Sequence, residues 1–195
     1  MKHLLLLSIC LLLFTSSTIF IAVSAATTAN PKIIIKTNMG NMEAELFQDK
    51  APISVKNFLS YMEKGHYKDT IFHRVINDFM IQGGGFDKNL KEKPTNTPIK
   101  NEANNGKKNE VGTLAYARTS AVDSASAQFF INVADNSFLD HRDNSDRGFG
   151  YAVFGKITSG MPVINRIKMV KTTTKGAYEN VPVEPVVILE IAQKK

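Results

Sequence analysis

An arginine and a glutamine, Arg74 and Gln82, stand among apolar residues in the stretch "IFHRVINDFMIQGGGF" (71–86), which predicts two short strands, 71–76 and 79–82. A guanidinium is a permanently charged, forked donor, and a neighbouring amide can hold it in one orientation. An arginine between apolar residues on a strand is also typical of a surface side chain or an ion-pair partner. This stretch alone leaves both interpretations open.

A second stretch, "AQFFINV" (127–133), also places amides beside an aromatic residue. Because side chains alternate along a strand, Phe129, Ile131 and Val133 share one face, which we expect to be core. Phe130 falls on the other face with Gln128 and Asn132. It could line a shallow apolar site there, or it could lie beneath a covering loop.

Other chemistries fail on spacing. The four histidines form no close metal-ligand pair, and the serines of "DSAS" (123–126) do not stand in a nucleophile elbow. The "QGGG" run (82–85) lacks the Lys-Ser/Thr pair of a phosphate loop, and the aspartates of "DHRDNSD" (140–146) miss the calcium-loop spacing. We therefore expect no metal and no cofactor, and we interpret the three glycines as positions of backbone freedom and close chain approach.

The elements that must position these residues are mainly strands. The predicted strands include 32–37, 42–47, 111–117, 127–133, 151–157 and 186–191. Two helices interrupt them: one follows Pro52 with apolar residues at helical spacing and ends near Gly65, and a shorter one contains Pro162. Many strands without a strand-helix-strand alternation predict a mainly β fold, a closed antiparallel barrel with two helices. Core-side residues such as Phe129 argue against an open interior, and hence against a carrier of small molecules.

The N-terminal residues read as a targeting segment rather than as part of the fold. Lys2 and His3 precede the apolar run 4–14, and small residues occupy the positions before a cut after Ala25. We therefore expect a secretory signal peptide at 1–25; a cut after Ala26 and an uncleaved anchor over 4–23 are the alternatives. The only cysteine, Cys10, lies inside this segment, so the mature chain permits an oxidising compartment without requiring one.

The composition fits one globular domain. The chain has 195 residues, of which 43% are hydrophobic and 22% are charged, with a net charge of +6. Much of the positive charge lies in 88–108, a stretch rich in Asn, Pro and Gly that is typical of a solvated loop. Without a nucleic-acid motif or a basic-aromatic helix, we expect no nucleic-acid partner.

Taken together, these motifs resemble one family. The segment "FHRVINDFMIQGGGF" is similar to the signature of the cyclophilin-type peptidyl-prolyl cis-trans isomerases, and "SAQFFINVADNSFLD" with "YAVFGKI" resembles that family's second conserved block. The similarity covers nearly all of 31–195, in order, and the bacterial periplasmic cyclophilins are the nearest subgroup. The resemblance implies an isomerase domain over 31–195 with an eight-stranded antiparallel barrel, two capping helices and a groove on the barrel's outside. It also implies proline-containing clients, folding of exported proteins, a periplasmic location, a monomer and no stable membrane association after signal cleavage.

The resemblance assigns roles residue by residue. Arg74 matches the catalytic arginine, Gln82 and Gln128 match amides that hold the arginine and the substrate backbone, and His73 matches a groove histidine. The residues that match the surroundings of the proline ring are Phe79, Met80, Phe130 and Leu139. Ala117 and Arg118 match backbone contacts to the substrate, although many members have Asn in place of Arg118.

Two aromatic positions depart from many eukaryotic members. Phe138 replaces a tryptophan and Tyr151 replaces a histidine, so an aromatic wall remains and isomerase activity is expected to survive. The lost indole N–H removes a donor associated with cyclosporin binding, and we expect this drug to bind weakly. The loop 140–150 is also longer than in many relatives, so the resemblance does not define the groove there.

The chemistry of prolyl isomerisation fits these residues without a covalent intermediate. Twisting the Xaa-Pro bond localises the lone pair of the prolyl nitrogen, and a guanidinium aimed at that nitrogen favours the transition state. A module that only binds proline-containing segments, or a holdase, is the rival from another class. Such a module would need the apolar residues but not Arg74 and Gln82, which favours the enzyme.

Overall fold

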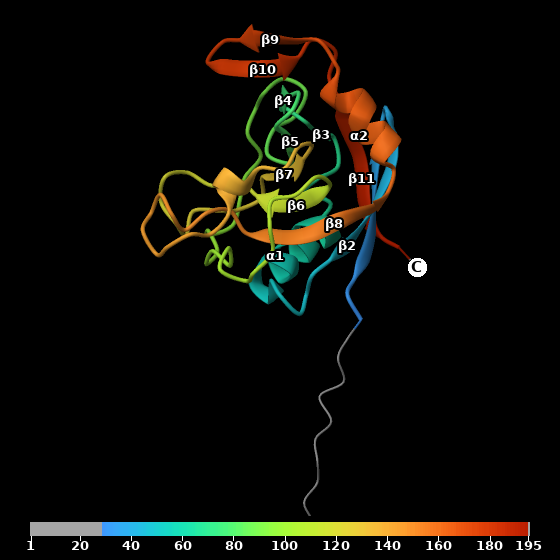
Figure 1. Cartoon of the computed structure of the whole chain (residues 1–195). Coiled ribbons are helices and arrows are strands. Elements are labelled where there is room, and N and C mark those ends of the chain that lie inside the picture. The colour runs from blue at the N-terminus through green and yellow to red at the C-terminus, as the bar shows by residue number, and fades with distance from the viewer. Residues whose placement is uncertain (1–28, 195) are drawn as a thin grey trace, which may run out of the picture.

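The computed structural model describes residues 29–194, and Figure 1 shows the whole chain. The signal peptide predicted at 1–25 lies outside these residues. The helices are α1 (Pro52–Glu63) and α2 (Met161–Lys168), with a single 3-10 turn, η1 (Ser137–Leu139). The strands are β1 (Lys32–Thr37), β2 (Gly40–Leu46), β3 (Thr70–Ile71), β4 (Arg74–Ile76), β5 (Met80–Gly83), β6 (Thr113–Tyr116), β7 (Phe129–Asn132), β8 (Val153–Ser159), β9 (Thr172–Lys175), β10 (Tyr178–Pro182) and β11 (Val187–Gln193).

The main sheet has nine strands in the order β3-β11-β1-β2-β8-β6-β7-β5-β4, and every pairing in it is antiparallel. It is strongly curled, but it keeps two edges, β3 and β4. The expectation of a closed eight-stranded barrel is therefore wrong in both strand number and closure. The mainly β class and the two helices are confirmed.

The failure to close has a simple cause in the chain. The stretch 71–76, predicted as one strand, is split into β3 and β4 by Phe72 and His73. Following the antiparallel pairings around the sheet, β3 and β4 run in the same direction. Two parallel strands pair only across a long crossover connection, and a two-residue link cannot provide one. The chain itself, rather than a ladder of hydrogen bonds, joins the two edges.

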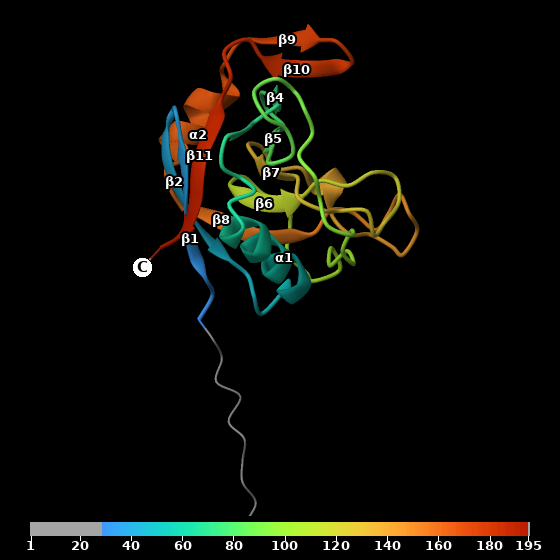
Figure 2. The same cartoon turned by 180° about the vertical axis from the view of Figure 1, so that it is seen from behind.

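Both helices pack against the core inside the curled sheet, at opposite ends in Figures 1 and 2. Pro52 begins α1, which buries Val55, Phe58 and Tyr61, and α2 buries Val163, Ile164 and Ile167. The core also contains Phe129, Ile131 and Val133, as the period of two in "AQFFINV" predicted. The interior is therefore filled with side chains.

A two-stranded hairpin, β9 and β10, was not predicted from the sequence. All four residues of β9 are exposed, so its pattern "TTTK" carries no alternation to detect. Figures 1 and 2 show the hairpin at the end of the molecule that carries β4, where β10 contacts β4. Neither α1 nor α2 is long and apolar enough to cross a membrane.

Candidate active site

The pairing register places the chemically interesting residues in one row across four strands. Arg74 on β4 is opposite Gln82 on β5, Gln82 is opposite Phe130 on β7, and Phe130 is opposite Ala115 on β6. The next row, one residue along, consists of Val75, Ile81, Ile131 and Leu114, which all belong to the main core. Because side chains alternate across a sheet, the row with Arg74 must point to the outer face. The site is thus built on the outside of the curled sheet, as the resemblance implied.

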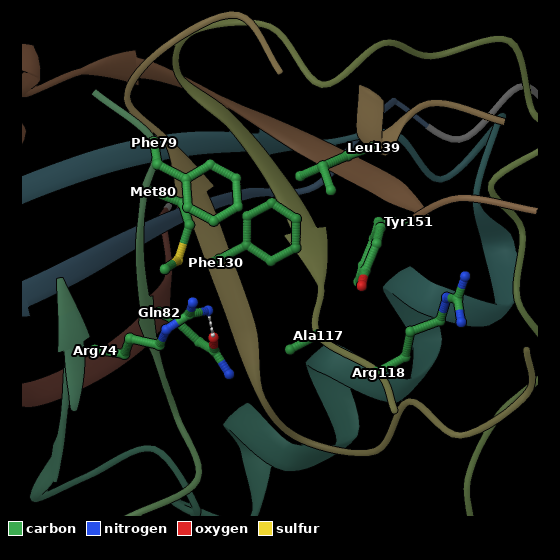
Figure 3. A pocket seen from close by; sticks show the side chains of 9 residues that line it. All are labelled: Arg74, Phe79, Met80, Gln82, Ala117, Arg118, Phe130, Leu139 and Tyr151. Atoms are coloured by element: carbon green, nitrogen blue, oxygen red, sulfur yellow. Dashed lines mark hydrogen bonds between the residues drawn. The ribbon is translucent and has the colours of Figure 1, made fainter. Parts of the chain in front are cut away.

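These residues line a pocket of about 110 Å³, shown in Figure 3. Nine residues line it: Arg74, Phe79, Met80, Gln82, Ala117, Arg118, Phe130, Leu139 and Tyr151. All nine are among the site residues predicted from the sequence. Its apolar side is a second hydrophobic cluster, separate from the main core, in which Met80, Phe130 and Leu139 are buried. We call Phe79, Met80, Phe130 and Leu139 the apolar floor.

Arg74 lies beside this floor with its charge available. Its Nη1 donates to Gln82 Oε1 over 3.5 Å, and Gln82 Nε2 donates to Gln128 Oε1 over 3.0 Å. Its guanidinium carbon is 6.0 Å from the centre of the Phe79 ring. Among residues 29–194, no carboxylate forms a salt bridge with Arg74. A half-buried cation held by an amide and unpaired with an acid can serve an incoming acceptor.

Arg118, at the other end of the pocket, is used differently. Its guanidinium donates to four backbone oxygens, those of Gly150, Thr119, Ser120 and Asp146. It also lies 4.8 Å from the centre of the Tyr151 ring. Figure 3 shows this guanidinium turned away from the pocket. Arg118 therefore links the loop 140–150 to the segment 118–120 and supports Tyr151, a role that no local pattern in the sequence predicted.

Three predicted site residues lie outside the pocket lining. Gln128 is beside the pocket, bonded to Gln82, and lines an adjoining hollow that also contains Thr119 and Glu92. Phe138 is on the rim with 62% of its surface exposed, and its ring stacks on Phe79 at 5.6 Å. The third, His73, is buried.

His73 is not among the residues that line the pocket, and its ring packs against Phe86. It is 5% exposed, its ring lies 4.6 Å from that of Phe86, and its Nδ1 has no hydrogen-bond partner in the part of the chain that the structure describes. Burial, followed by the positive charge of Arg74, lowers the pKa of His73 to about 4. His73 is therefore neutral near pH 7, and the structure does not bring it together with the other predicted site residues.

The residues that sequence reasoning missed lie behind the floor. Ala115 and Val153 complete the second hydrophobic cluster. Four polar residues, Asn109, Asn132, Asn136 and Asp140, are buried next to it. The only signal in the sequence was Asn132 beside Phe130, because the stretch 134–140 otherwise looks like an exposed turn. In residues 29–194 no group of three His, Cys, Asp or Glu side chains could hold a metal ion.

Three comparisons with known proteins agree with this geometry. Residues 32–193 match the family model described as "Cyclophilin type peptidyl-prolyl cis-trans isomerase/CLD". The chain is 56% identical over 172 residues to a peptidyl-prolyl cis-trans isomerase of Acinetobacter baylyi, covering 88% of this chain and 90% of that protein. It is 55% identical over 156 residues to peptidyl-prolyl cis-trans isomerase B of Escherichia coli, covering 80% and 95% of the two chains.

Solved structures show the same likeness. A crystal structure of a cyclophilin-type peptidyl-prolyl cis-trans isomerase from Cryptosporidium parvum, in the presence of the dipeptide Ala-Pro, superposes with a TM-score of 0.69. The two sequences are 26% identical, and the alignment covers 84% of this chain and 99% of the other.

Proposed function

The chain belongs to the cyclophilin family of peptidyl-prolyl cis-trans isomerases, and we propose that its pocket binds the proline ring on the apolar floor while Arg74 stabilises the twisted Xaa-Pro bond. The observation that carries this proposal is that one pocket combines an apolar floor with a guanidinium that forms no salt bridge within residues 29–194. The relative from Cryptosporidium parvum, solved in the presence of Ala-Pro, supports a proline-containing ligand.

The reaction has to overcome amide resonance. The barrier to rotation is about 18–20 kcal/mol, although the two isomers of an Xaa-Pro bond differ by only about 0.5–1 kcal/mol. Rotation breaks no bond to a nucleophile, so the enzyme needs only to bind the half-rotated amide better than either planar isomer.

Arg74 supplies that difference in binding. In a planar amide the nitrogen lone pair is delocalised and accepts no hydrogen bond. At the half-rotated point the prolyl nitrogen is pyramidal, and its lone pair becomes an acceptor for the Arg74 N–H groups. Gln82 holds the guanidinium in place before the substrate arrives, so little reorganisation is needed at the transition state.

The apolar floor fixes the ring while the preceding carbonyl rotates. Phe79, Met80, Phe130 and Leu139 form the apolar side of the pocket of about 110 Å³, and a five-membered proline ring can pack on them. Phe138 extends this surface outward by stacking on Phe79. The role of His73 in substrate binding stays a prediction.

The test of this assignment follows the cis-to-trans relaxation of a short Xaa-Pro peptide. We expect Arg74→Ala to lower kcat/KM about 10²- to 10³-fold, as the loss of one transition-state donor does elsewhere. Arg74→Lys should keep more of the wild-type kcat/KM than Arg74→Ala but not all of it, because an ammonium lacks the planar, forked N–H donors of a guanidinium. The matched control is Arg166→Ala, which should keep full activity. Arg166 lies on α2, outside the pocket lining, and donates to Met39 O. Full activity in folded Arg74→Ala would refute the assignment.

We further propose that the isomerase acts outside the cytosol, as a monomer in the periplasm without stable membrane association, on exported clients whose folding waits for Xaa-Pro isomerisation. The support is the apolar N-terminal run with small residues before Ala26, and a sequence without cysteine after Cys10 is compatible with that location. Processing would leave an isomerase domain over 31–195. Expression in a bacterial host followed by osmotic shock should release a chain that begins at Ala26, measured by intact mass. A chain that keeps Met1, or that stays with the cytosolic or membrane fraction, would contradict the proposal.

A further inference from the structure

Directly behind the apolar floor lies a chain of three buried amides that ends at a buried carboxylate, which we call the amide relay: Asn136, Asn132, Asn109 and Asp140. Their exposed fractions are 3%, 0%, 2% and 8%. Asn136 Nδ2 donates to Asn132 Oδ1 over 2.7 Å, and Asn132 Nδ2 donates to Asn109 Oδ1 over 3.2 Å. The relay ends at Asp140 Oδ1, which accepts from the backbone N of Asn109 over 2.8 Å and from its Nδ2 over 3.1 Å.

The direction of every bond in the relay is fixed by its ends. A carboxylate only accepts, so Asn109 must turn its amide nitrogen toward Asp140. A backbone carbonyl also only accepts, and Asn136 Nδ2 donates its second hydrogen to Phe79 O over 2.9 Å. The remaining Asn132 hydrogen is donated to Thr113 Oγ1 over 2.9 Å. With both ends defined, the middle amide has only one orientation that satisfies its neighbours.

The relay is connected to the backbone of the floor at several points. Besides the bond to Phe79 O, Asn136 O accepts from Leu139 N over 2.9 Å. Asn109 Nδ2 also lies 3.5 Å from the carbonyl oxygen of Tyr151, whose own N donates to Leu139 O over 2.9 Å. Phe79, Leu139 and Tyr151 come from three separate segments, and Figure 3 shows them around Phe130 on the side of the pocket away from Arg74.

The position of the relay behind the floor distinguishes it from other buried polar residues of the protein. Asn132 shares its strand face with Phe130 and is opposite Met80, so an apolar residue there would simply enlarge the floor. A buried amide instead requires every partner in place, because an unsatisfied group in the interior is costly. Apolar packing tolerates sliding, whereas a satisfied hydrogen-bond chain admits one arrangement.

We propose that the amide relay positions the floor relative to Arg74, with Asn136 and Asn109 as positioning residues for the isomerase reaction. The inference rests on the pocket function proposed above. It predicts that the relay affects kcat more than KM. Apolar contact with the proline ring survives a small shift of Phe79 or Leu139, but alignment of the prolyl nitrogen with the guanidinium does not.

The test compares Asn136→Asp and Asn136→Ala with wild type in the peptide relaxation assay, below the unfolding transition of each. Asn136→Asp is nearly isosteric but turns an acceptor toward Phe79 O and Asn132 Oδ1. For Asn136→Asp we expect kcat to fall roughly tenfold to a hundredfold, with KM changed less than about threefold. Thr37→Ala is the matched control: it also removes a hydrogen bond made by a buried polar side chain, from Thr37 Oγ1 to Gly40 O over 2.6 Å, in the turn between β1 and β2. It should lower stability and leave both constants unchanged.

A double-mutant cycle tests whether the relay acts as one unit. If it does, Asn136→Ala with Asn109→Ala should lower kcat no more than the worse single variant, because either change already breaks the chain. If Asn136→Asp does not fold, Asn109→Ser makes the same test from the far end. Wild-type kcat in folded Asn136→Asp, or in folded Asn109→Ser in its place, would overturn the inference, as would full additivity in the cycle. Arg74→Ala in the same assay distinguishes failure of the relay proposal from failure of the proposed pocket function. Full activity in folded Arg74→Ala would refute the pocket function.

Discussion

Arg74 is useful because its neighbours leave its charge uncompensated. Within residues 29–194 the guanidinium donates to the amide oxygen of Gln82, forms no salt bridge, and lies beside the apolar floor at 6.0 Å from the centre of the Phe79 ring. Arg118, which also lines the pocket, has the same side chain, but its guanidinium donates hydrogen bonds to four backbone carbonyl oxygens. The residue type therefore does not decide the role. The partners that the fold supplies decide it.

Phe138 offers a prediction at the residue scale. Its ring is exposed and stacked on Phe79, so a larger indole can take its place without disturbing the core. Phe138→Trp adds an N–H donor at the rim, and we expect cyclosporin affinity to rise about fivefold to tenfold, the value of one net hydrogen bond. Titration calorimetry measures the change, with Phe138→Leu as the control without a donor. Equal affinity in Phe138→Trp and wild type, or tight binding by wild type, would contradict the account of weak binding.

The elements owe their placement to contacts made far along the chain. Helix α1 has no side-chain cap from its own N-cap residue, Ala51, and no acid in its first turn. Glu102 supplies both functions from the loop 101–109, because its carboxylate accepts from Ile53 N, Ser54 N and Ser54 Oγ. A carboxylate at a helix N-terminus accepts hydrogen bonds from the free N–H groups, and its negative charge is attracted by the positive end of the helix dipole.

Removing that contact should weaken the fold and spare the chemistry. We expect Glu102→Ala to lower the free energy of unfolding by about 1–2 kcal/mol, as the loss of a helix cap does. Urea denaturation gives the value, and the relaxation assay at low temperature should show unchanged kcat/KM. Glu92→Ala, on an exposed acid of the same long connection, is the control for charge alone. Unchanged stability in Glu102→Ala would show that the cap contributes nothing.

The glycine run at the end of β5 includes a position where both the backbone conformation and the available space favour glycine. Gly84 has φ of +84°, and a Cβ there would lie 3.0 Å from the Phe129 and Tyr67 rings. Gly65 has a similar φ of +66° with no atom within 4 Å of the same position. We therefore expect Gly84→Ala to lower the free energy of unfolding by about 3 kcal/mol, because it adds both backbone strain and crowding. Gly65→Ala should lower it by about 1 kcal/mol, because it adds backbone strain alone. Equal losses in thermal and urea unfolding would show that crowding at Gly84 is relieved at no cost.

At the scale of the whole molecule, the curled sheet separates stability from catalysis. Its inner face holds the main core, and its outer face carries the pocket. Its open edge at β4 is bordered by the β9–β10 hairpin, where Tyr178 packs on Phe86 and Phe86 packs on His73. A covered edge is protected from pairing with other chains. The same packing buries His73.

Burial of His73 makes the stability of the whole molecule depend on pH. Its pKa is lowered from 6.5 to about 4, so between these values the unfolded chain binds a proton that the folded chain does not. Stability is therefore fully present above pH 6.5, is lost as pH falls toward 4, and loses nothing more from this group below that. The loss is roughly 3 kcal/mol, and His66, whose pKa is also lowered by burial, adds to it in the same direction. Urea denaturation from pH 7 to 4 should show this slope, and His73→Phe should reduce it. An unchanged slope in that variant would assign the effect elsewhere.

The sequence predicted most of the elements and the nine residues that line the pocket, because periodicity of two, helix-starting prolines and a specific family resemblance are all local signals. It failed where the outcome depends on distant partners. The split at Phe72 and His73 follows from the direction of two strands around the whole sheet, and the exposed hairpin has no apolar alternation. The amide relay joins residues 109 to 140, and nothing in their neighbours predicts that they are buried.

The most direct test of the central claim measures binding and rotation in the same sample. Exchange NMR on a short Xaa-Pro peptide gives its dissociation constant and the rate of cis-trans interconversion while bound, for wild type and for Arg74→Met. If Arg74 acts on the half-rotated amide alone, the bound rate falls about 10²-fold or more while the dissociation constant changes less than about threefold. An unchanged bound rate in the variant, or a loss of activity explained entirely by weaker binding, would contradict the account.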